Sequence, residues 1–146
     1  MRNATILGAG LVGSVLAILL RQKGYEVTVY ERRPDMRKDN SGGGRSINLA
    51  LSERGWKALD MAHMRSAIEP IALPMRGRYL HQGDGSIAFQ AYGKNGEAIF
   101  SVSRGELNKR LMDRAESIGV NIYFGHRCRK VNVQDNVIYL IDERGR

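Results

Sequence analysis

The feature that most constrains this chain is a glycine-rich turn near its start, Gly-Ala-Gly-Leu-Val-Gly at residues 8–13. It follows a short apolar run, residues 4–7, and opens an apolar segment, residues 11–23, that predicts a helix. In such a strand-turn-helix unit the first glycine permits the tight turn. The second lets the backbone approach a pyrophosphate, and the third lets the helix pack closely on the strand. The sequence therefore predicts a dinucleotide-binding βαβ unit in an α/β fold.

A second strand supports this interpretation. Gly24 ends the predicted helix, residues 26–30 form an alternating apolar run, and Glu31 follows directly. An acidic side chain about twenty residues past the glycine turn is placed to bind the ribose diol of a dinucleotide. The pyrophosphate would lie at the helix N-terminus, where free N–H groups and the positive end of the dipole favour anions. The alternative is a glycine turn in an unrelated α/β protein.

Charge and length limit the function classes. The 146 residues are one domain by length, and 23 Lys and Arg against 15 Asp and Glu give a net charge of +8. The basic residues at 32–38 are interspersed with acids, and those at 127–130 are not grouped in a long run. Charge spread in this way is typical of a solvated surface, so we predict no nucleic-acid partner.

The remaining chemistry-bearing residues indicate a bound cofactor. A single cysteine, Cys128, excludes an internal disulfide and is typical of a reducing compartment, and the apolar run at 15–20 is too short to span a membrane. We therefore predict a cytoplasmic protein with no membrane span in this chain. The three histidines, with one cysteine, lack the spacing of a metal site, and no Gly-x-Ser-x-Gly motif is present. Chemistry would have to come from a bound dinucleotide.

The rest of the chain alternates between strand, helix and turn patterns. Residues 34–44 predict a loop, 45–51 a strand, and Ser52 begins a predicted helix through Met64, after which Leu73-Pro74 interrupts the pattern. The later expectations are a hairpin of strands 76–81 and 86–90 around Asp84-Gly85, a strand at 99–102, a helix from the Ser103/Glu106 capping box to Ile118, a strand at 120–124, and a strand pair at 129–133 and 137–141.

Several segments occur together in one known family. They are Gly8-Ala-Gly-Leu-Val-Gly13, Val29-Tyr30-Glu31, Gly44-Arg-Ser-Ile-Asn-Leu-Ala-Leu-Ser52, Pro74-Met-Arg-Gly-Arg78, Tyr92-Gly93 and Ser101-Val-Ser-Arg104 with Leu107-Asn-Lys109. The first two occur in many flavoproteins, whereas the third and fourth are more specific. Their order along nearly the whole chain resembles the kynurenine 3-monooxygenase family of FAD-dependent aromatic hydroxylases.

This resemblance implies a fold and a reaction. The fold is a Rossmann-like FAD-binding fold of the glutathione-reductase type with inserted β-hairpin elements. Residues 1–146 would be its N-terminal FAD-binding region, including part of a substrate-domain β insertion at about residues 74–102. The reaction would be hydroxylation of L-kynurenine to 3-hydroxykynurenine, with O2 as co-substrate, FAD as cofactor and NADPH as hydride donor. It belongs to tryptophan catabolism and to NAD synthesis.

The resemblance also implies site residues, none of them catalytic. The cofactor-binding positions would be Gly8, Gly10, Leu11, Val12, Gly13, Tyr30, Glu31, Arg32, Arg33, Ala50, Arg104 and Cys128, and the substrate-binding positions would be Arg78 and Tyr92. An arginine can hold an amino-acid carboxylate through two parallel hydrogen bonds, although a solvated strand arginine is the plain alternative for Arg78. Arg104 at a helix start opposes the dipole, which favours an anionic partner there.

The chain stops earlier than the members of this family. Their second and third FAD motifs are missing, so we expect a fold that is incomplete at its C-terminus, inactive alone, and able to associate through an exposed sheet edge. Two other functions stay open. One is an NAD-binding oxidoreductase domain, in which Glu31 would select an unphosphorylated ribose. The other is a basic partner-binding module with a vestigial dinucleotide fold.

Overall fold

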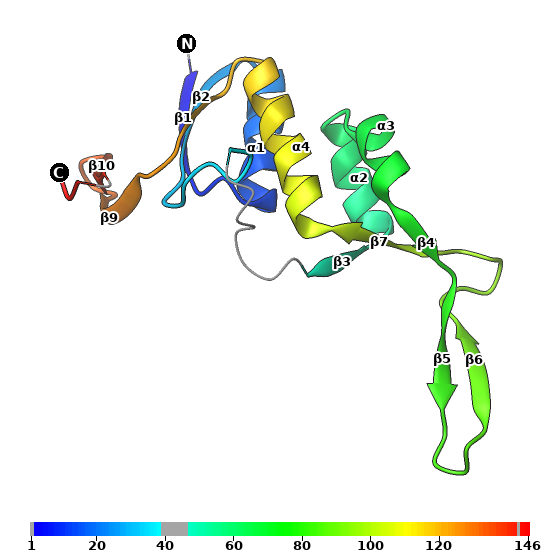
Figure 1. Cartoon of the computed structure of the whole chain (residues 1–146). Helices are drawn as coiled ribbons and strands as arrows, with labels where there is room; N and C mark the ends of the chain where they lie inside the picture. The colour runs from blue at the N-terminus through cyan, green and yellow to red at the C-terminus, as the bar shows by residue number, and fades with distance from the viewer. Residues whose placement is uncertain (1, 39–46, 143) are drawn as a thin grey trace. The chain divides into compact units, whose positions relative to one another are not determined.

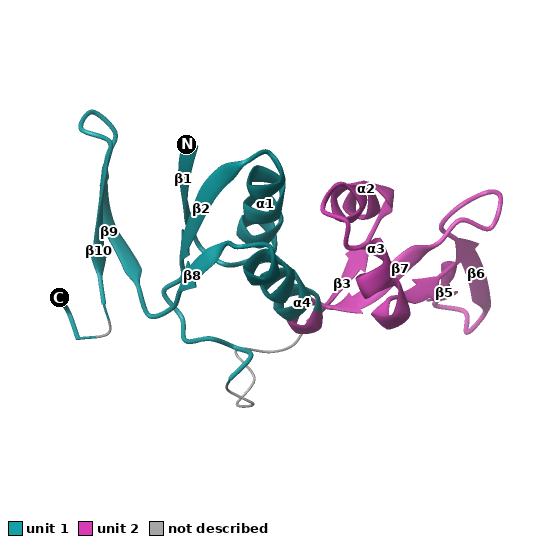
Figure 2. Cartoon of the chain, turned by 90° about the horizontal axis from the view of Figure 1, so that it is seen from above, with its two compact units in different colours: residues 1–46, 107–146 teal, residues 47–106 magenta. Residues whose placement is uncertain are grey.

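The computed structural model describes residues 2–38, 47–142 and 144–146. The chain divides into two compact units, which are coloured separately in Figure 2. The first consists of Met1–Ser46 and Leu107–Arg146, and the second of Ile47–Glu106. The insertion predicted at about residues 74–102 falls inside the second unit.

The first unit is built on a parallel sheet. Its strands β1 (Arg2–Leu7), β2 (Tyr25–Tyr30) and β8 (Asn121–Tyr123) lie in the order β1-β2-β8. The register places Thr5 opposite Thr28 and Thr28 opposite Asn121. Side chains alternate between the two faces, so Val27 and Val29 are buried on one face while Tyr30 lies on the other.

Two helices cover one face of this sheet. These are α1 (Leu11–Gln22) and the part of α4 (Arg104–Ser117) that belongs to the first unit, and Figure 2 shows both on the same side of the strands. Their buried residues are Ser14, Ala17 and Ile18 on α1 and Leu107, Leu111, Met112 and Ala115 on α4. The core of the unit therefore lies between the helices and the sheet, as a βαβ unit requires.

A hairpin follows the sheet. Strands β9 (Arg127–Asn132) and β10 (Val137–Ile141) pair antiparallel, with an irregularity between Tyr139 and Leu140. Asn136, in the turn between the two strands, has a φ of +53°, which asparagine tolerates better than most residues. The β9–β10 pairing confirms the strand pair expected from the sequence.

The second unit combines a small sheet, short helices and a second hairpin, and Figure 1 labels its strands and α-helices. Strands β3 (Asn48–Leu51), β7 (Ile99–Ser103) and β4 (Leu73–Met75) form a sheet in the order β3-β7-β4. The helices are α2 (Glu53–Met61), α3 (Arg65–Ile68) and the 3-10 helix η1 (Glu69–Ile71), and the hairpin consists of β5 (Gly77–His81) and β6 (Ile87–Ala91). The core contains Leu51, Trp56, Leu59, Ile68 and Val102.

One local prediction in this unit was wrong, and one strand was not predicted. The helix expected from Ser52 to Met64 ends at Met61, because His63 has a φ of +54°, which no α-helix continues. The Leu73-Pro74 pair interrupts the helical pattern as expected, but it also begins strand β4, which was not predicted. Proline is tolerated there because β4 is an outer strand of its sheet, where no neighbour needs its missing N–H.

Candidate functional site

The glycine turn between β1 and α1 has the geometry that its sequence predicts. Gly8 has a φ of +106°, in the left-handed region that favours glycine, and its N–H donates to the Tyr30 carbonyl at 2.8 Å. A Cβ added to Gly13 would lie 1.9 Å from the carbonyl oxygen of Gly8. The first and third glycines are therefore required by the turn itself and by the close approach of α1.

The second glycine leaves space beside the turn. A Cβ added to Gly10 would meet no atom within 4 Å, and Gly10 is the N-cap of α1 without a side-chain hydrogen bond from any described residue. The first turn of α1 carries no acidic residue, and Val12 is 81% exposed. The free N–H groups at this helix start therefore fit a phosphate anion.

The carboxylate of Glu31 closes the other side of the turn. Its Oε2 accepts the N–H of Ala9 at 2.9 Å, and its Oε1 accepts the N–H of Arg33 at 2.9 Å. A carboxylate oxygen has more than one acceptor position, so both oxygens can still accept hydrogen bonds from hydroxyl groups. This arrangement fits a ribose diol at the end of β2.

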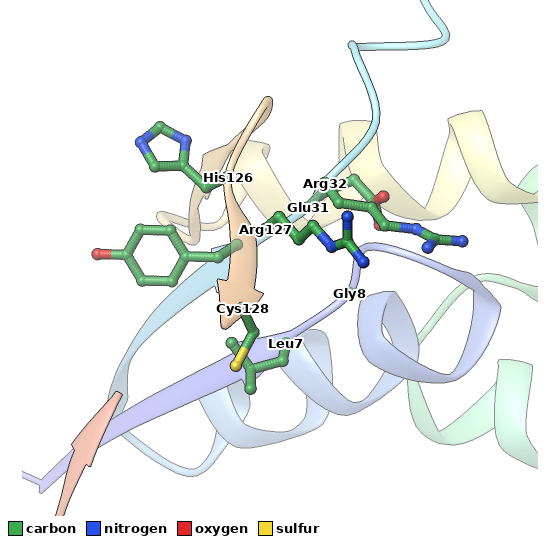
Figure 3. A pocket seen from close by; sticks show the side chains of 8 residues that line it. Leu7, Gly8, Glu31, Arg32, His126, Arg127 and Cys128 are labelled. Carbon is green, nitrogen blue, oxygen red and sulfur yellow. The ribbon is translucent and has the colours of Figure 1, made fainter. Parts of the chain in front are cut away.

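These groups border one open pocket of about 280 Å³ in the first unit, shown from close by in Figure 3. The lining comes from the ends of β1 and β2 and the start of β9, and consists of Leu7, Gly8, Tyr30, Glu31, Arg32, His126, Arg127 and Cys128. Five predicted cofactor-binding residues therefore lie together: Gly8, Tyr30, Glu31, Arg32 and Cys128. Gly10, Leu11, Val12 and Gly13 continue the turn into α1, and Arg33 donates its N–H to Glu31 without lining the pocket.

His126 and Arg127 are pocket residues that the sequence did not single out. The His126 N–H donates to the Glu31 carbonyl at 2.9 Å, and its Nδ1 lies 2.8 Å from the Phe124 carbonyl oxygen. Its ring centroid is 5.7 Å from that of Tyr30. In Figure 3 the Arg127 side chain extends toward the glycine turn. The sequence could have indicated these two residues, because they directly precede the predicted cofactor-binding residue Cys128.

An ionic cluster fixes the segment that follows Glu31. The Arg37 guanidinium binds both carboxylate oxygens of Asp35 at 2.8 Å, and its Nη1 also contacts Asp113 and Glu116 on α4. The side-chain hydrogen bond from Arg37 is the main reason why the pKa of Asp35 lies below its ordinary value. The same partners raise the pKa of Arg37, so the pair stays ionised and holds this segment against α4.

The remaining predicted site residues belong to the second unit, and they are Ala50, Arg78, Tyr92 and Arg104. Ala50 lies on β3 opposite Ser101, and Arg104 is the exposed first residue of α4. Arg78 lies on β5, where its Nε donates to the Gln90 side chain at 2.7 Å. Tyr92 donates its N–H to the Arg76 carbonyl at 2.9 Å and is 43% exposed. Arg78 and Gln90 are opposite each other in the register of the hairpin, so their side chains share one face, and Tyr92 directly follows the end of β6.

Residues 2–38, 47–142 and 144–146 contain no group of three or more His, Cys, Asp or Glu side chains that could hold a metal ion. No described helix is long and apolar enough to cross a membrane.

Known proteins resemble this chain both in sequence and in structure. Residues 6–47 match the family described as NAD(P)-binding Rossmann-like domain. The kynurenine 3-monooxygenase of Christiangramia forsetii is 47% identical over 138 residues, which are 94% of this chain and 31% of that protein. The kynurenine 3-monooxygenase of Flavobacterium johnsoniae is 48% identical over 141 residues, which are 96% of this chain and 31% of that protein.

Solved structures show the same fold at lower identity. A p-nitrophenol 4-monooxygenase from Pseudomonas putida matches with a TM-score of 0.78 at 17% identity, over 99% of this chain and 38% of that one. A 2-methyl-3-hydroxypyridine-5-carboxylic acid oxygenase matches with a TM-score of 0.77 at 19% identity, over 95% and 37%. These matches confirm the predicted Rossmann-like fold. By sequence the chain is similar to the kynurenine 3-monooxygenases, and it spans 31% of the length of the two relatives described above.

Proposed function

We propose that this chain binds FAD and forms part of an NADPH-using monooxygenase that hydroxylates L-kynurenine to 3-hydroxykynurenine with O2. The similarity to kynurenine 3-monooxygenases over nearly the whole chain supports the substrate and the reaction class. The observation that carries the cofactor assignment is the Glu31 carboxylate, which holds the Ala9 and Arg33 amides at the mouth of the glycine turn.

The described residues fit the parts of a dinucleotide. The turn from Gly8 to Gly13 would hold the pyrophosphate, Glu31 would accept the ribose hydroxyls, and the segment around Cys128 would contact the adenine end. Arg32, Arg33 and Arg104 would add positive charge, and Ala50 would approach the flavin. The bound flavin supplies oxygen activation, for which the described side chains offer no equivalent group.

The substrate would bind the second unit. The Nε–H of Arg78 donates to the Gln90 side chain, and the two terminal NH2 groups of its guanidinium make no hydrogen bond within the described part of the chain. They can therefore hold a carboxylate bidentately. Tyr92, which directly follows β6 and bonds to the Arg76 carbonyl, would add a hydroxyl and an apolar ring.

A second candidate function is an NAD-binding oxidoreductase domain. The match of residues 6–47 to an NAD(P)-binding domain favours it, because the same turn and acid serve NAD as well as FAD. In that case Arg78 and Tyr92 would have no aromatic amino acid to hold.

Titration of the purified chain with FAD and, separately, with NAD tests both candidates, with flavin fluorescence and thermal stability as readouts. Gly10→Val places a branched side chain where the pyrophosphate would approach, and no atom within 4 Å opposes it in the free protein. We expect this variant to retain its melting temperature but lose FAD affinity. Gly83→Val is the matched control, because a Cβ there also meets no atom within 4 Å.

Glu31→Ala completes the test, and its control is Glu26→Ala at an exposed position on β2, the strand that Glu31 directly follows. We expect Glu31→Ala to weaken FAD binding at least tenfold, on the order of one charge-assisted hydrogen bond. Preference of the unsubstituted chain for NAD would favour the second candidate. No binding of either dinucleotide by the folded chain would contradict both.

We also propose that the chain works in the cytoplasm. We propose further that it self-associates through the outer edge of β1, because β1 pairs with no described strand other than β2. Sedimentation velocity over a range of concentrations tests the association. Thr5→Lys, on the exposed part of β1, should shift the equilibrium to monomer. A concentration-independent monomer before substitution would contradict the proposal.

A further inference from the structure

The backbone of Ala9, in the middle of the glycine turn, is held from two sides. Its N–H donates to Glu31 Oε2 at 2.9 Å, and its carbonyl accepts Asn108 Nδ2 of helix α4 at 2.9 Å, across 99 residues of sequence. Ser14 Oγ donates to the same carbonyl at a longer 3.3 Å. Ala9 is only 3% exposed, so these side chains take the place of water as its partners.

The orientation of the Asn108 amide follows from its neighbours. Its Nδ2 donates to the Ala9 carbonyl and lies 3.6 Å from the Met36 sulfur, which are both acceptors. The reverse orientation would place Oδ1 against the Ala9 carbonyl, acceptor against acceptor. In the observed orientation Oδ1 is buried and has no hydrogen-bond partner among the described residues. A buried acceptor without a partner lowers the stability of the folded chain. Packing alone would therefore favour an apolar side chain of the same shape at this position.

Peptide geometry connects Asn108 to the ligand side of the turn. In a trans peptide the carbonyl of one residue and the N–H of the next point in opposite directions, and the chain has no cis peptide bond among its described residues. Asn108 holds the Ala9 carbonyl toward α4, so the Gly10 N–H of the same peptide plane points away from α4. That N–H has no hydrogen-bond partner among the described residues, and Gly10 borders open space.

We propose that Asn108 is a positioning residue that aims the Gly10 N–H at the pyrophosphate of the bound dinucleotide. It acts through the Ala9–Gly10 peptide and does not touch the ligand. The inference rests on the proposed function, because the ligand is the FAD assigned there. It gives a residue far from the glycine motif a part in binding the cofactor.

Asn108→Leu tests this role, because it removes the donor together with the partnerless Oδ1. We expect the FAD dissociation constant to rise about tenfold, the equivalent of one hydrogen bond. The melting temperature of the free chain should change little, because the Ala9 carbonyl keeps Ser14 Oγ as a donor and the loss of the partnerless Oδ1 offsets the lost hydrogen bond. Asn108→Asp keeps the shape without the donor and decides the question if the leucine variant does not fold. Ser117→Ala is the control, since it removes a side-chain hydrogen bond to the Arg114 carbonyl on the same helix.

Amide hydrogen exchange of the free chain gives a readout without FAD. The Ala9 N–H should exchange faster in the Asn108 variants than in the Ser117 control. Unchanged affinity, or weaker binding in proportion to a lower melting temperature, would overturn the inference. If the unsubstituted chain binds no FAD, the proposed function fails, and the exchange rate alone decides whether Asn108 positions the turn: a faster Ala9 exchange supports it and an unchanged one overturns it.

Discussion

At the scale of single residues, two glycines of one turn are constrained in opposite ways. Alanine at residue 13 would place its Cβ 1.9 Å from the Gly8 carbonyl oxygen, so backbone must move, whereas alanine at residue 10 meets no atom within 4 Å. We expect Gly13→Ala to lower the free energy of unfolding by about 2 kcal/mol, as overpacking does, and Gly10→Ala to change it little. Urea denaturation measures the free energy of unfolding of both variants. Equal losses would contradict the close approach of residue 13 to the Gly8 carbonyl.

A second prediction at this scale concerns the pH dependence of stability. The Arg37 side chain lowers the pKa of Asp35 in the folded chain below its unfolded value of about 4. The resulting stabilisation is fully present above the unfolded pKa and is lost as pH falls through the folded pKa. We expect Asp35→Asn to lower the free energy of unfolding by about 2 kcal/mol at pH 7, with a smaller difference in acid.

Denaturation curves at a series of pH values check this, with Glu26→Gln as the control on exposed β2 surface. A loss for Asp35→Asn that does not shrink as the pH falls would mean that ionisation of Asp35 is not its source.

At the scale of elements, the ends of α1 and α4 form a matched pair. Gly24 and Gly119 follow these helices with φ values of +80° and +89°. A Cβ on Gly24 would meet nothing within 4 Å, whereas one on Gly119 would lie 3.1 Å from an Arg21 amine. Arg21 also ties the helices together, because its Nε donates to the Ile118 carbonyl at 2.8 Å.

Alanine should lower the stability of the chain at both positions, because both glycines have a positive φ. At Gly119 the nearby Arg21 side chain adds a second cause. We expect Gly24→Ala to cost about 1 kcal/mol through its left-handed φ alone. Gly119→Ala should cost more, because the Arg21 side chain must also shift. Thermal unfolding of both variants in parallel measures the difference, and the reverse order would show that the Arg21 contact is unimportant.

At the scale of the whole molecule, the division into two units predicts separable binding effects. Glu31 belongs to the first unit and Arg78 to the second. We expect Glu31→Ala to weaken FAD binding without removing Arg78 as a carboxylate partner. Arg78→Ala should weaken kynurenine binding at least tenfold and leave FAD affinity unchanged. Calorimetric titration of each variant with each ligand measures this, with Arg129→Ala on β9 as the arginine control. Equal effects on both ligands would contradict separate roles.

The sequence by itself determined the order of the elements and the character of the glycine turn. These depend on near neighbours: Gly8 needs its positive φ, Glu31 directly follows β2, and the Ser103 hydroxyl caps α4 by accepting the Glu106 N–H at 3.4 Å. Local patterns of this kind are readable without a fold. They also account for the resemblance to the kynurenine 3-monooxygenases, which rests on short motifs in a fixed order.

Only the tertiary structure decided which distant residues meet. Asn108 reaches Ala9 across 99 residues, and Arg37 meets Asp113 on α4 across 76. The packing of α4 against the sheet creates these contacts, and no periodicity in the sequence encodes them. Packing likewise brings His126 and Arg127 to the pocket and leaves Pro74 on an outer strand. The strand at Pro74 and the unforeseen pocket residues share one cause, since each depends on a neighbour that is remote along the chain.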